Sequence, residues 1–305
     1  MRTLYLDLSM GVAGDMFSAA LLDLLSMEAR EKTLSHLNEI GLPSLWVSVK
    51  QEEKCGLSGL QLQVEINGTE ELPENTGNHD SGYHHNHDHD SREDLHQGHH
   101  HEHDHESHED LHQGHFHGTH HHHHGGRSLE EVFSIIENLQ VSQNTKTKVK
   151  TMYEIIAKAE GLAHNKEAGE VHFHEVGMND AIFDVCAAAL LMDELRVDAV
   201  KASFVCVGKG KVKCAHGILD VPAPATKHIL EEGNVPYYYS EDEIGELTTP
   251  TGAAIISFFA DEYLNFEDIK EQCKNHESAK VLSGYGMGHK DFSKPNCVRA
   301  YLVVA

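Results

Sequence analysis

Hydrophobic and polar positions alternate along the chain with the periods of strands and helices. Residues 3–8 follow the period of two of a strand, and a turn at 11–14 leads into a helix whose apolar face includes Phe17 and Leu21. Similar patterns predict helices over 29–40, 128–139, 143–162, 181–195, 223–231 and 250–263, and strands over 46–50, 60–66, 200–207, 209–213, 235–239 and 298–304. The alternation predicts an α/β or α+β fold, a mixed sheet with flanking helices, and leaves the strand order open.

The helix predicted over 128–139 begins with a specific capping signal. Ser128 precedes the first apolar residue of this helix, and Glu131 follows three positions later. This spacing is typical of a capping box, in which each side chain accepts a hydrogen bond from the backbone N–H of the other residue.

Residues 69–126 interrupt the pattern of regular elements. The stretch 79–124 holds 20 of the 28 histidines of the chain, among Asp, Glu and Gly and with almost no apolar side chain. A segment that cannot bury apolar surface does not fold alone. We therefore expect a disordered, His-rich loop insertion at 69–126, within a core domain formed by 1–68 and 127–305.

This insert is predicted to hold divalent metal ions. Imidazole with carboxylates suits nickel, copper or zinc, and the tract lacks the Cys and Met that favour copper(I), so nickel or zinc is expected first. The sequence Glu-Asp-Leu-His-Gln-Gly-His occurs at 93–99 and again at 109–115, which suits a store that depends on the number of ligands. An inert solvated spacer is the alternative. The predicted ligands are His84, His85, His87, His89, His99, His100, His101, His103, His105, His120, His121, His122, His123 and His124.

The chain is strongly acidic. Its formal net charge is -25, and residues 70–126 contribute thirteen acidic side chains against one arginine. This balance disfavours nucleic acid as a partner. The sequence has no C-x-x-C pair among its six cysteines, no signal peptide, and no run of about 18 apolar residues. We expect a protein of the reducing cytoplasm that neither binds nucleic acid nor spans a membrane.

Two histidines and two aspartates form a candidate catalytic or metal-binding set. His172 and His174 lie two residues apart, so on an extended chain their imidazoles project to one face while Phe173 points to the other. Asp180 and Asp184 follow, one turn apart at the start of a strongly apolar helix. Capping explains Asp180 but not Asp184. We predict metal binding or acid–base chemistry, with structural hydrogen bonding as the alternative.

A second candidate site lies between a strand and a helix near the start of the chain. The turn bounded by Gly11 and Gly14 presents free backbone N–H groups, which suit a phosphate. The segment lacks a P-loop or dinucleotide fingerprint, and its two acids, Asp7 and Asp15, suit a metal-bridged phosphate. A tight turn with an N-cap is the alternative.

Three lysines close to His216 form a third candidate site. Lys209, Lys211 and Lys213 alternate, so on one strand their ammonium groups would share a face. In an acidic chain these lysines are candidates for binding a phosphate. An edge strand protected by lysines is the alternative.

Five ordered motifs resemble those of the LarC-type nickel insertion proteins, over nearly the whole chain outside the insert. They are G-V-A-G-D-M at 11–16, V-H-F-H-E-V-G at 171–177 with Asp180 and Asp184, H-G-I-L-D-V-P-A-P-A-T at 216–226, E-L-T-T-P-T-G-A-A at 246–254, and G-Y-G-M-G at 284–288 leading to Pro295 and Asn296.

The resemblance implies a cyclometallase that inserts nickel into pyridinium-3,5-bisthiocarboxylic acid mononucleotide. Two Ni–S bonds and one Ni–C bond complete the pincer cofactor of lactate racemase, whose apoprotein is an implied partner. The family uses CTP with Mn(II) or Mg(II). Full-length members continue beyond the segment matching 296–303 into a second domain that carries the nucleotide site. This chain is therefore expected to match the N-terminal part and to work with a separate C-terminal half.

The sequence thus predicts a nickel-inserting enzyme of the lyase class. Two alternatives stay open: a non-catalytic nickel store or metallochaperone, and a zinc- or nickel-dependent hydrolase, which is disfavoured because no H-E-x-x-H spacing occurs. The expected catalytic residues are His172, His174, Asp180, Asp184 and His216, with His172 and His174 also as metal ligands. The expected cofactor-binding residues are Asp7, Gly11, Gly14, Asp15, Lys209, Lys211 and Lys213.

Overall fold

The computed structural model describes residues 1–70, 126–214, 217–274 and 280–305. These residues belong to one compact unit. The His-rich insert and His216 lie outside the described residues, so the division into core and insert, and the metal ligands expected in the insert, stay predictions. Within the described part of the chain, no helix is long and apolar enough to cross a membrane.

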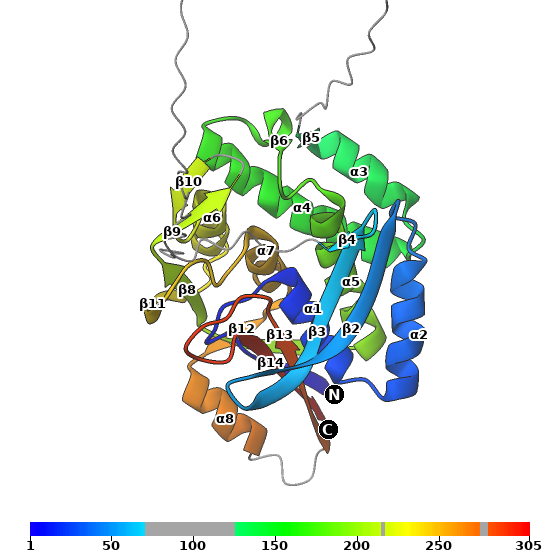
Figure 1. The fold of residues 1–305 in the computed structure, drawn as a ribbon, viewed down its shortest axis with the longest axis vertical. Coiled ribbons are helices and arrows are strands. Elements are labelled where there is room, and N and C mark those ends of the chain that lie inside the picture. Colours follow the sequence, from blue (N-terminus) through cyan, green and yellow to red (C-terminus); the bar gives the residue numbers. More distant parts are fainter. Residues whose placement is uncertain (71–125, 215–216, 275–279) are drawn as a thin grey trace, which may run out of the picture. The chain divides into compact units, whose positions relative to one another are not determined.

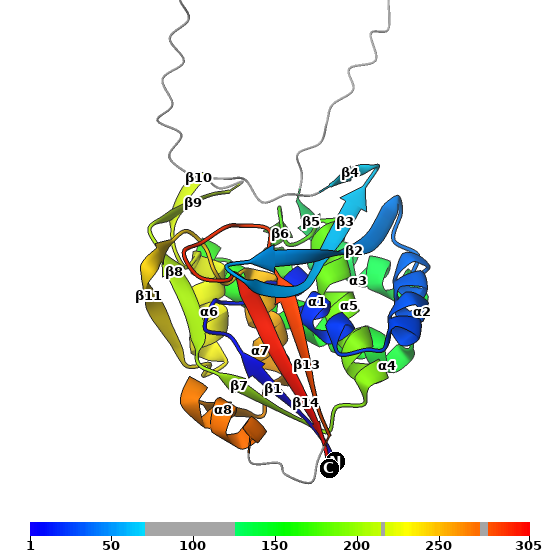
Figure 2. The ribbon, with the colours of Figure 1, turned by 60° about the horizontal axis from the view of Figure 1, so that its bottom comes forward.

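A mixed sheet forms the centre of the fold (Figure 1). Its strands stand in the order β12 (Glu262–Leu264), β7 (Ala199–Ser203), β1 (Arg2–Asp7), β14 (Cys297–Val304), β13 (Lys280–Met287), β3 (Leu57–Ile66) and β2 (Leu45–Lys54), and β4 (Thr69–Glu70) pairs with β3. β1 runs parallel to β7 and antiparallel to β14, and Figure 2 shows it between these two strands. The predicted mixed sheet with flanking helices is confirmed.

The alternation of side chains along β1 explains how helices cover both faces of the sheet. Leu4 points into the main core, which includes α1 (Gly14–Asp23). Tyr5 points the other way and packs with Ile269 of α8 (Phe266–Lys274). Full burial of a large apolar side chain stabilises the fold by about 1.5–3 kcal/mol, so both faces contribute to stability.

Helix α1 packs directly on β13 because two glycines of that strand leave room for its backbone. A Cβ on Gly284 would lie 2.3 Å from the carbonyl oxygen of Ala20, and a Cβ on Gly286 would lie 1.8 Å from that of Met16. The glycines of the G-Y-G-M-G motif therefore allow a helix to pack closely on the strand.

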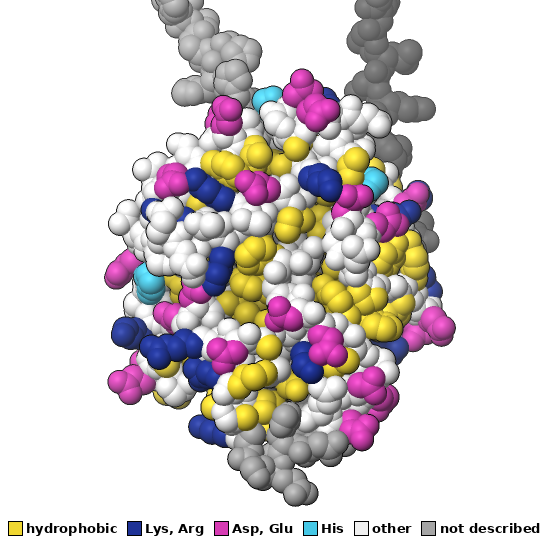
Figure 3. All heavy atoms as spheres, turned by 180° about the vertical axis from the view of Figure 1, so that it is seen from behind, with side chains coloured by type: hydrophobic (Ala, Val, Ile, Leu, Met, Phe, Trp, Pro, Cys, Tyr) yellow, Lys and Arg dark blue, Asp and Glu magenta, His cyan; other side chains and the backbone are white. Residues whose placement is uncertain are grey.

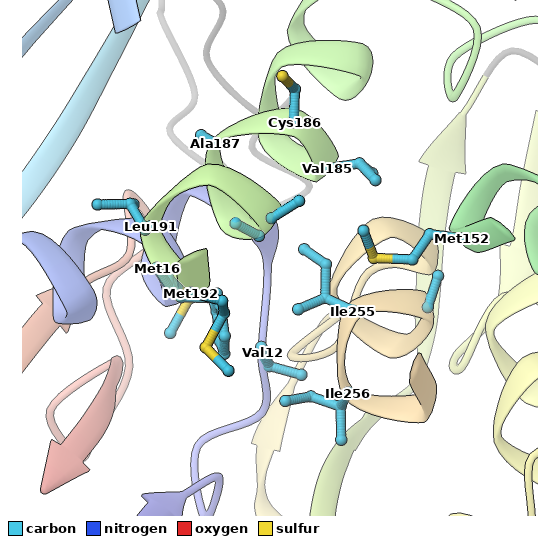
Figure 4. Packing of buried hydrophobic residues seen from close by; sticks show 14 of the residues in the cluster. Val12, Met16, Met152, Val185, Cys186, Ala187, Leu191, Met192, Ile255 and Ile256 are labelled. Atoms are coloured by element: carbon cyan, nitrogen blue, oxygen red, sulfur yellow. The ribbon is translucent and has the colours of Figure 1, made fainter. Parts of the chain in front are cut away.

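Two further helices pack against α1 on this side of the sheet. α5 (Asn179–Leu195) and α7 (Pro250–Phe259) both contact α1. Apolar side chains such as Val12, Val185 and Ile255 fill the space between these helices (Figure 4). The other helical elements described are α2 (Met27–Asn38), α3 (Leu129–Asn138), α4 (Gln143–His164), α6 (Pro224–Glu232) and a 3-10 turn (Ala168–Glu170).

Small strand pairs flank the main sheet. They are β5 (Arg127–Ser128) with β6 (His172–Phe173), β8 (Val205–Lys209) with β11 (Tyr237–Ile244), and β9 (Lys211–Cys214) with β10 (Gly217–Asp220). The first pair leads into α3, whose predicted capping box between Ser128 and Glu131 is confirmed.

Three predicted elements differ from the structure. The strand predicted over 200–207 is divided into β7, which belongs to the main sheet, and β8, which pairs with β11. Gly210, with a φ of +90°, separates β8 from β9, so the strand predicted over 209–213 is divided. The helix predicted over 250–263 ends early because the backbone N–H of Asp261 donates to the carbonyl oxygen of Val200 at 2.9 Å. This bond starts the pairing of β12 with β7, an interaction that local periodicity does not reveal. β12, β13 and α8 were not predicted.

The face turned away from the view of Figure 1 exposes several patches of hydrophobic side chains between acidic and basic ones (Figure 3). Much of the accessible surface of any folded protein is apolar. We therefore assign no function to these patches.

Candidate functional site

The N-terminal ends of α1, α5 and α7 meet on one side of the sheet. Gly14 begins α1 directly against α5, and a Cβ on it would lie 2.6 Å from Oδ2 of Asp184. Gly252, in the first turn of α7, leaves room for the carbonyl oxygen of Val12, which a Cβ would approach to 2.2 Å. Because helix N-termini carry positive partial charge, their junction favours carboxylates and other anions.

The loop between β1 and α1 is fixed to the segment that precedes α7. Gly11 has a φ of +76°, and a Cβ on it would lie 2.1 Å from the carbonyl oxygen of Leu247. The N–H of Val12 donates to Oγ1 of Thr248 at 3.3 Å, and the N–H of Thr249 donates to the carbonyl oxygen of Val12 at 3.1 Å. The motifs at 11–16 and 246–254 are therefore joined into one rigid unit.

Three aspartates belong to this junction: Asp15 on α1, and Asp180 and Asp184 on α5. Burial raises the pKa of each of them. The pKa of Asp184 is raised well above its usual value, first by burial and then by the negative charges of Asp15 and Asp180. Asp184 therefore holds a proton at pH values where an ordinary aspartate is ionised.

The loop after β13 carries two basic residues, His289 and Lys290, whose charges lower the pKa of nearby carboxylates. Nε2 of His289 lies 3.5 Å from Oδ2 of Asp15. The charges of His289 and Lys290 oppose the effect of burial on the pKa of Asp15. The buried Lys54 of β2 fixes this loop, because its Nζ donates to the carbonyl oxygens of His289 at 3.4 Å and Lys290 at 3.0 Å.

Two side-chain amides secure the same loop. Nε2 of Gln61 donates to the carbonyl oxygen of Gly288, and Nδ2 of Asn296 donates to that of Lys290, both at 2.9 Å. Sequence reasoning gave His289 and Lys290 no role. Their anchors on β2 and β3 are more than 200 positions away in the chain, so only the fold reveals the arrangement.

Glu246 is a second functional candidate without a role in the sequence analysis. Burial raises its pKa to about 7, while the charge of Lys290 opposes this rise and that of Glu175 adds to it. Neither acid carries a signal by itself: Glu246 is the first residue of the motif at 246–254, and Glu175 lies within the motif at 171–177.

The predicted arrangement of His172 and His174 is confirmed locally. Both are exposed, and Phe173 between them is only 1% exposed. Within the described ranges, however, no group of three or more His, Cys, Asp or Glu side chains is placed to hold a metal ion. The structure brings Asp180 and Asp184 together with Asp15. The roles predicted for the two histidines stay predictions.

Asp7 takes a structural position. It is fully buried, accepts a hydrogen bond from Nη1 of Arg299 at 2.8 Å and another from the N–H of Ser9 at 2.9 Å. Its predicted part in phosphate binding stays a prediction, but both carboxylate oxygens are already engaged.

The three predicted phosphate-binding lysines do not share one strand. Lys209 ends β8 and donates to the carbonyl oxygen of Glu241, whereas Lys211 and Lys213 lie on β9. Lys211 forms an exposed ion pair with Asp220 at 2.8 Å. Binding of a phosphate by these lysines also stays a prediction.

A separate cavity of about 310 Å³ lies at the other ends of α5 and α7. Its lining includes Lys148, Asp193, Arg196, Phe258 and Phe259. None of the residues proposed for chemistry lines it, and Lys148 pairs with Asp193. We therefore place the functional site at the N-terminal ends of the helices.

Residues 4–305 match the family described as nickel insertion protein, and the chain belongs to this family. It is 33% identical over 301 residues to the pyridinium-3,5-bisthiocarboxylic acid mononucleotide nickel insertion protein of Alkaliphilus metalliredigens, covering 98% of this chain and 60% of that protein. Proteins of the same name from Clostridium kluyveri and Clostridium acetobutylicum are 35% and 38% identical over 99% of the chain, which covers 62% and 64% of them.

The chain thus spans less than two thirds of the length of these relatives. No solved structure matches it significantly. Membership of the family connects the chain to nickel insertion in cofactor synthesis.

Proposed function

We propose that this protein inserts nickel into pyridinium-3,5-bisthiocarboxylic acid mononucleotide, as a cyclometallase of the lyase class. The observation that carries the proposal is the junction of three helix N-termini, where burial raises the pKa of Asp15 and Asp184. The charges of His289 and Lys290 act on Asp15, and the charge of Lys290 also acts on Glu246. The product would be the nickel pincer cofactor of lactate racemase, formed in the cytoplasm.

The charges at this junction complement the chemistry of the proposed substrate. A pyridinium ring is cationic and suits the carboxylates, whereas the thiocarboxylates and the phosphate are anionic and suit Lys290 and the helix N-termini. Charges of both signs, held on rigid elements, favour one orientation of such a molecule.

Nickel is a substrate of this reaction, and its final ligands come from the organic substrate: two sulfur atoms and one ring carbon. Thiocarboxylate sulfur is a soft donor that nickel accepts. A protein cage with three or more ligands would compete with these bonds. The absence of such a cage among the described residues is compatible with transfer of nickel at the junction.

CTP with Mn(II) or Mg(II) belongs to the proposed function, but the described residues do not fit a site for it. Lys211 is paired with Asp220, both oxygens of Asp7 are engaged, and no described cluster of carboxylates could hold the cation. We derive no step through CTP. The chain covers only 60% of the relative from Alkaliphilus metalliredigens, and the resemblance implies that the nucleotide site lies in a second, C-terminal domain. We propose that CTP binds to such a C-terminal half.

The His-rich insert supports a second role as a nickel reservoir. Its 20 histidines far exceed the ligands that one catalytic site needs. This observation also favours the alternative function, a non-catalytic nickel store or metallochaperone. The two functions differ in product formation, because an enzyme makes the nickelated pincer whereas a store only releases metal.

Mass spectrometry of the precursor tests the proposal. The chain is incubated with precursor, nickel and CTP, with and without a separately supplied C-terminal half. We expect a product that contains one nickel and has lost the ring hydrogen between the two thiocarboxylates. Nickel binding without this product under both conditions would identify a store.

A further inference from the structure

Glu246 is a carboxylate that the stability of the fold does not explain. Its side chain is partly exposed, yet enough protein surrounds the carboxylate to raise its pKa to about 7. Among the described residues it has no hydrogen-bond donor and no ion-pair partner within 4 Å; the charged groups that influence it are Lys290 and Glu175. A carboxylate that is largely surrounded by protein and is stabilised by no hydrogen bond or ion pair costs free energy, so its presence calls for a chemical role.

The backbone around Glu246 is held in place on both sides. The N–H of Gly245 donates to the carbonyl oxygen of Lys209 at 2.8 Å, and Gly208 leaves room for the carbonyl oxygen of Gly245. On the other side, Leu247 contacts Gly11 in the loop that leads to α1. Glu246 is therefore anchored to the same rigid unit that carries Asp15, as a positioned base must be.

We propose that Glu246 is the catalytic base that removes the proton from carbon 4 of the pyridinium ring, the carbon between the two thiocarboxylates. This assignment rests on the proposed function. The C–H bond breaks, its electron pair forms the Ni–C bond, and the proton passes to the carboxylate of Glu246. Nickel stays Ni(II), and no oxidant or reductant is needed.

Other carboxylates of the junction suit this step less well. Burial and two neighbouring negative charges favour the protonated form of Asp184, which cannot accept a proton. Asp15 faces His289 at 3.5 Å and is already engaged. Glu246 has the pKa that matches a base working near neutral pH, and its partial exposure leaves it accessible to a substrate.

The test uses the full chain, with the C-terminal half added to every sample, and a precursor that carries deuterium at carbon 4. Removal of a base typically costs 100-fold or more, so we expect Glu246→Gln to insert nickel roughly 100-fold more slowly. The variant should accumulate a sulfur-bound nickel complex that retains the deuterium. The rate of the parent should rise with pH up to about 7 and then level, because only the ionised base accepts a proton, and the variant should lose this dependence.

Glu160→Gln is the matched control. Burial also raises the pKa of Glu160, but this carboxylate faces His164 at 3.5 Å, and we expect the rate of the parent. Glu246→Asp, which keeps a carboxylate, should retain the pH dependence at a reduced rate. Circular dichroism shows whether each variant is folded.

The possible outcomes separate the two proposals. Insertion by Glu246→Gln within a few-fold of the parent rate, with loss of deuterium, would overturn the assignment of the base alone. Equal loss of rate and of pH dependence in the Gln and Asp variants would also overturn it, because it would indicate a structural role. Absence of insertion by the parent would overturn the proposed function and this assignment together.

Discussion

Asp184 is the residue at which chemistry and stability conflict most directly. It lies on α5 among buried apolar residues such as Phe183 and Val185, with the backbone of Gly14 against its carboxyl group. Burial and the charges of two other aspartates oppose its ionisation. Such a group is retained for function at a cost in stability.

We expect Asp184→Asn to stabilise the fold and to abolish nickel insertion. The pKa of Asp184 is raised in the folded state, so the stability that its protonated form provides is present at low pH and is lost as pH rises through the folded pKa. The amide does not ionise. The variant should therefore gain about 1 kcal/mol over the parent at pH 8, with a smaller gain at pH 5.

Thermal unfolding at both pH values and the insertion assay measure the two effects. A melting temperature at pH 8 below that of the parent would contradict the assignment of Asp184 as a destabilising carboxylate. Activity equal to that of the parent would remove it from the functional site.

At the scale of elements, the loop after β13 shows how a strand distant in sequence positions residues of the candidate site. Lys54 at the end of β2 holds the carbonyl oxygens of His289 and Lys290, and it also pairs with Asp291. A buried lysine that donates hydrogen bonds to backbone oxygens of a loop fixes the conformation of that loop. This structural role outweighs the charge that the lysine adds to the site.

We expect Lys54→Met to raise the KM for the precursor about tenfold, because Lys290 would no longer be held toward the carboxylates. Unpaired carbonyl groups would also destabilise the fold by about 1–3 kcal/mol. Lys50→Met is the control: Lys50 lies on the same strand and is exposed, and within the described part of the chain its only ion pair is with Glu52 at 3.4 Å. Equal KM values for both variants would show that the anchor does not position the site.

The contact between β13 and α1 gives a prediction for stability. Gly286→Ala places a methyl group 1.8 Å from the carbonyl oxygen of Met16, so α1 must shift, and we expect a loss of about 1–3 kcal/mol in chemical denaturation. Gly169→Ala is the matched control, because nothing lies within 4 Å of its added Cβ. An equal loss of stability in both variants would show that the close approach of α1 to β13 does not contribute to the stability of the fold.

At the scale of the whole molecule, we expect metal storage and chemistry to be separable. Deletion of residues 79–124 should remove most bound nickel while leaving the fold and, at saturating nickel, the insertion activity. Nickel binding by the parent should weaken as pH falls through about 6.5, because protonated imidazole is no longer a ligand. Metal analysis and circular dichroism of both proteins measure these effects, and unchanged stoichiometry after deletion would contradict the reservoir.

The sequence by itself determined which segments form most helices and strands, because periodicity and capping are local. The capping box at Ser128, the alternation of His172 and His174 around Phe173, and α5 with its two aspartates all followed from neighbouring residues. The five motifs, as a resemblance, also indicated the family that the comparison then confirmed.

Only the tertiary structure decided the strand order, the end of α7 and the composition of the junction. Asp15 is brought to Asp184 by the packing of α1 on α5, and Lys290 is held by a lysine on β2. The raised pKa of Glu246 likewise depends on burial and on charges from other segments. These properties arise from contacts between positions far apart in the chain. The residues next to each position in the sequence do not reveal such contacts.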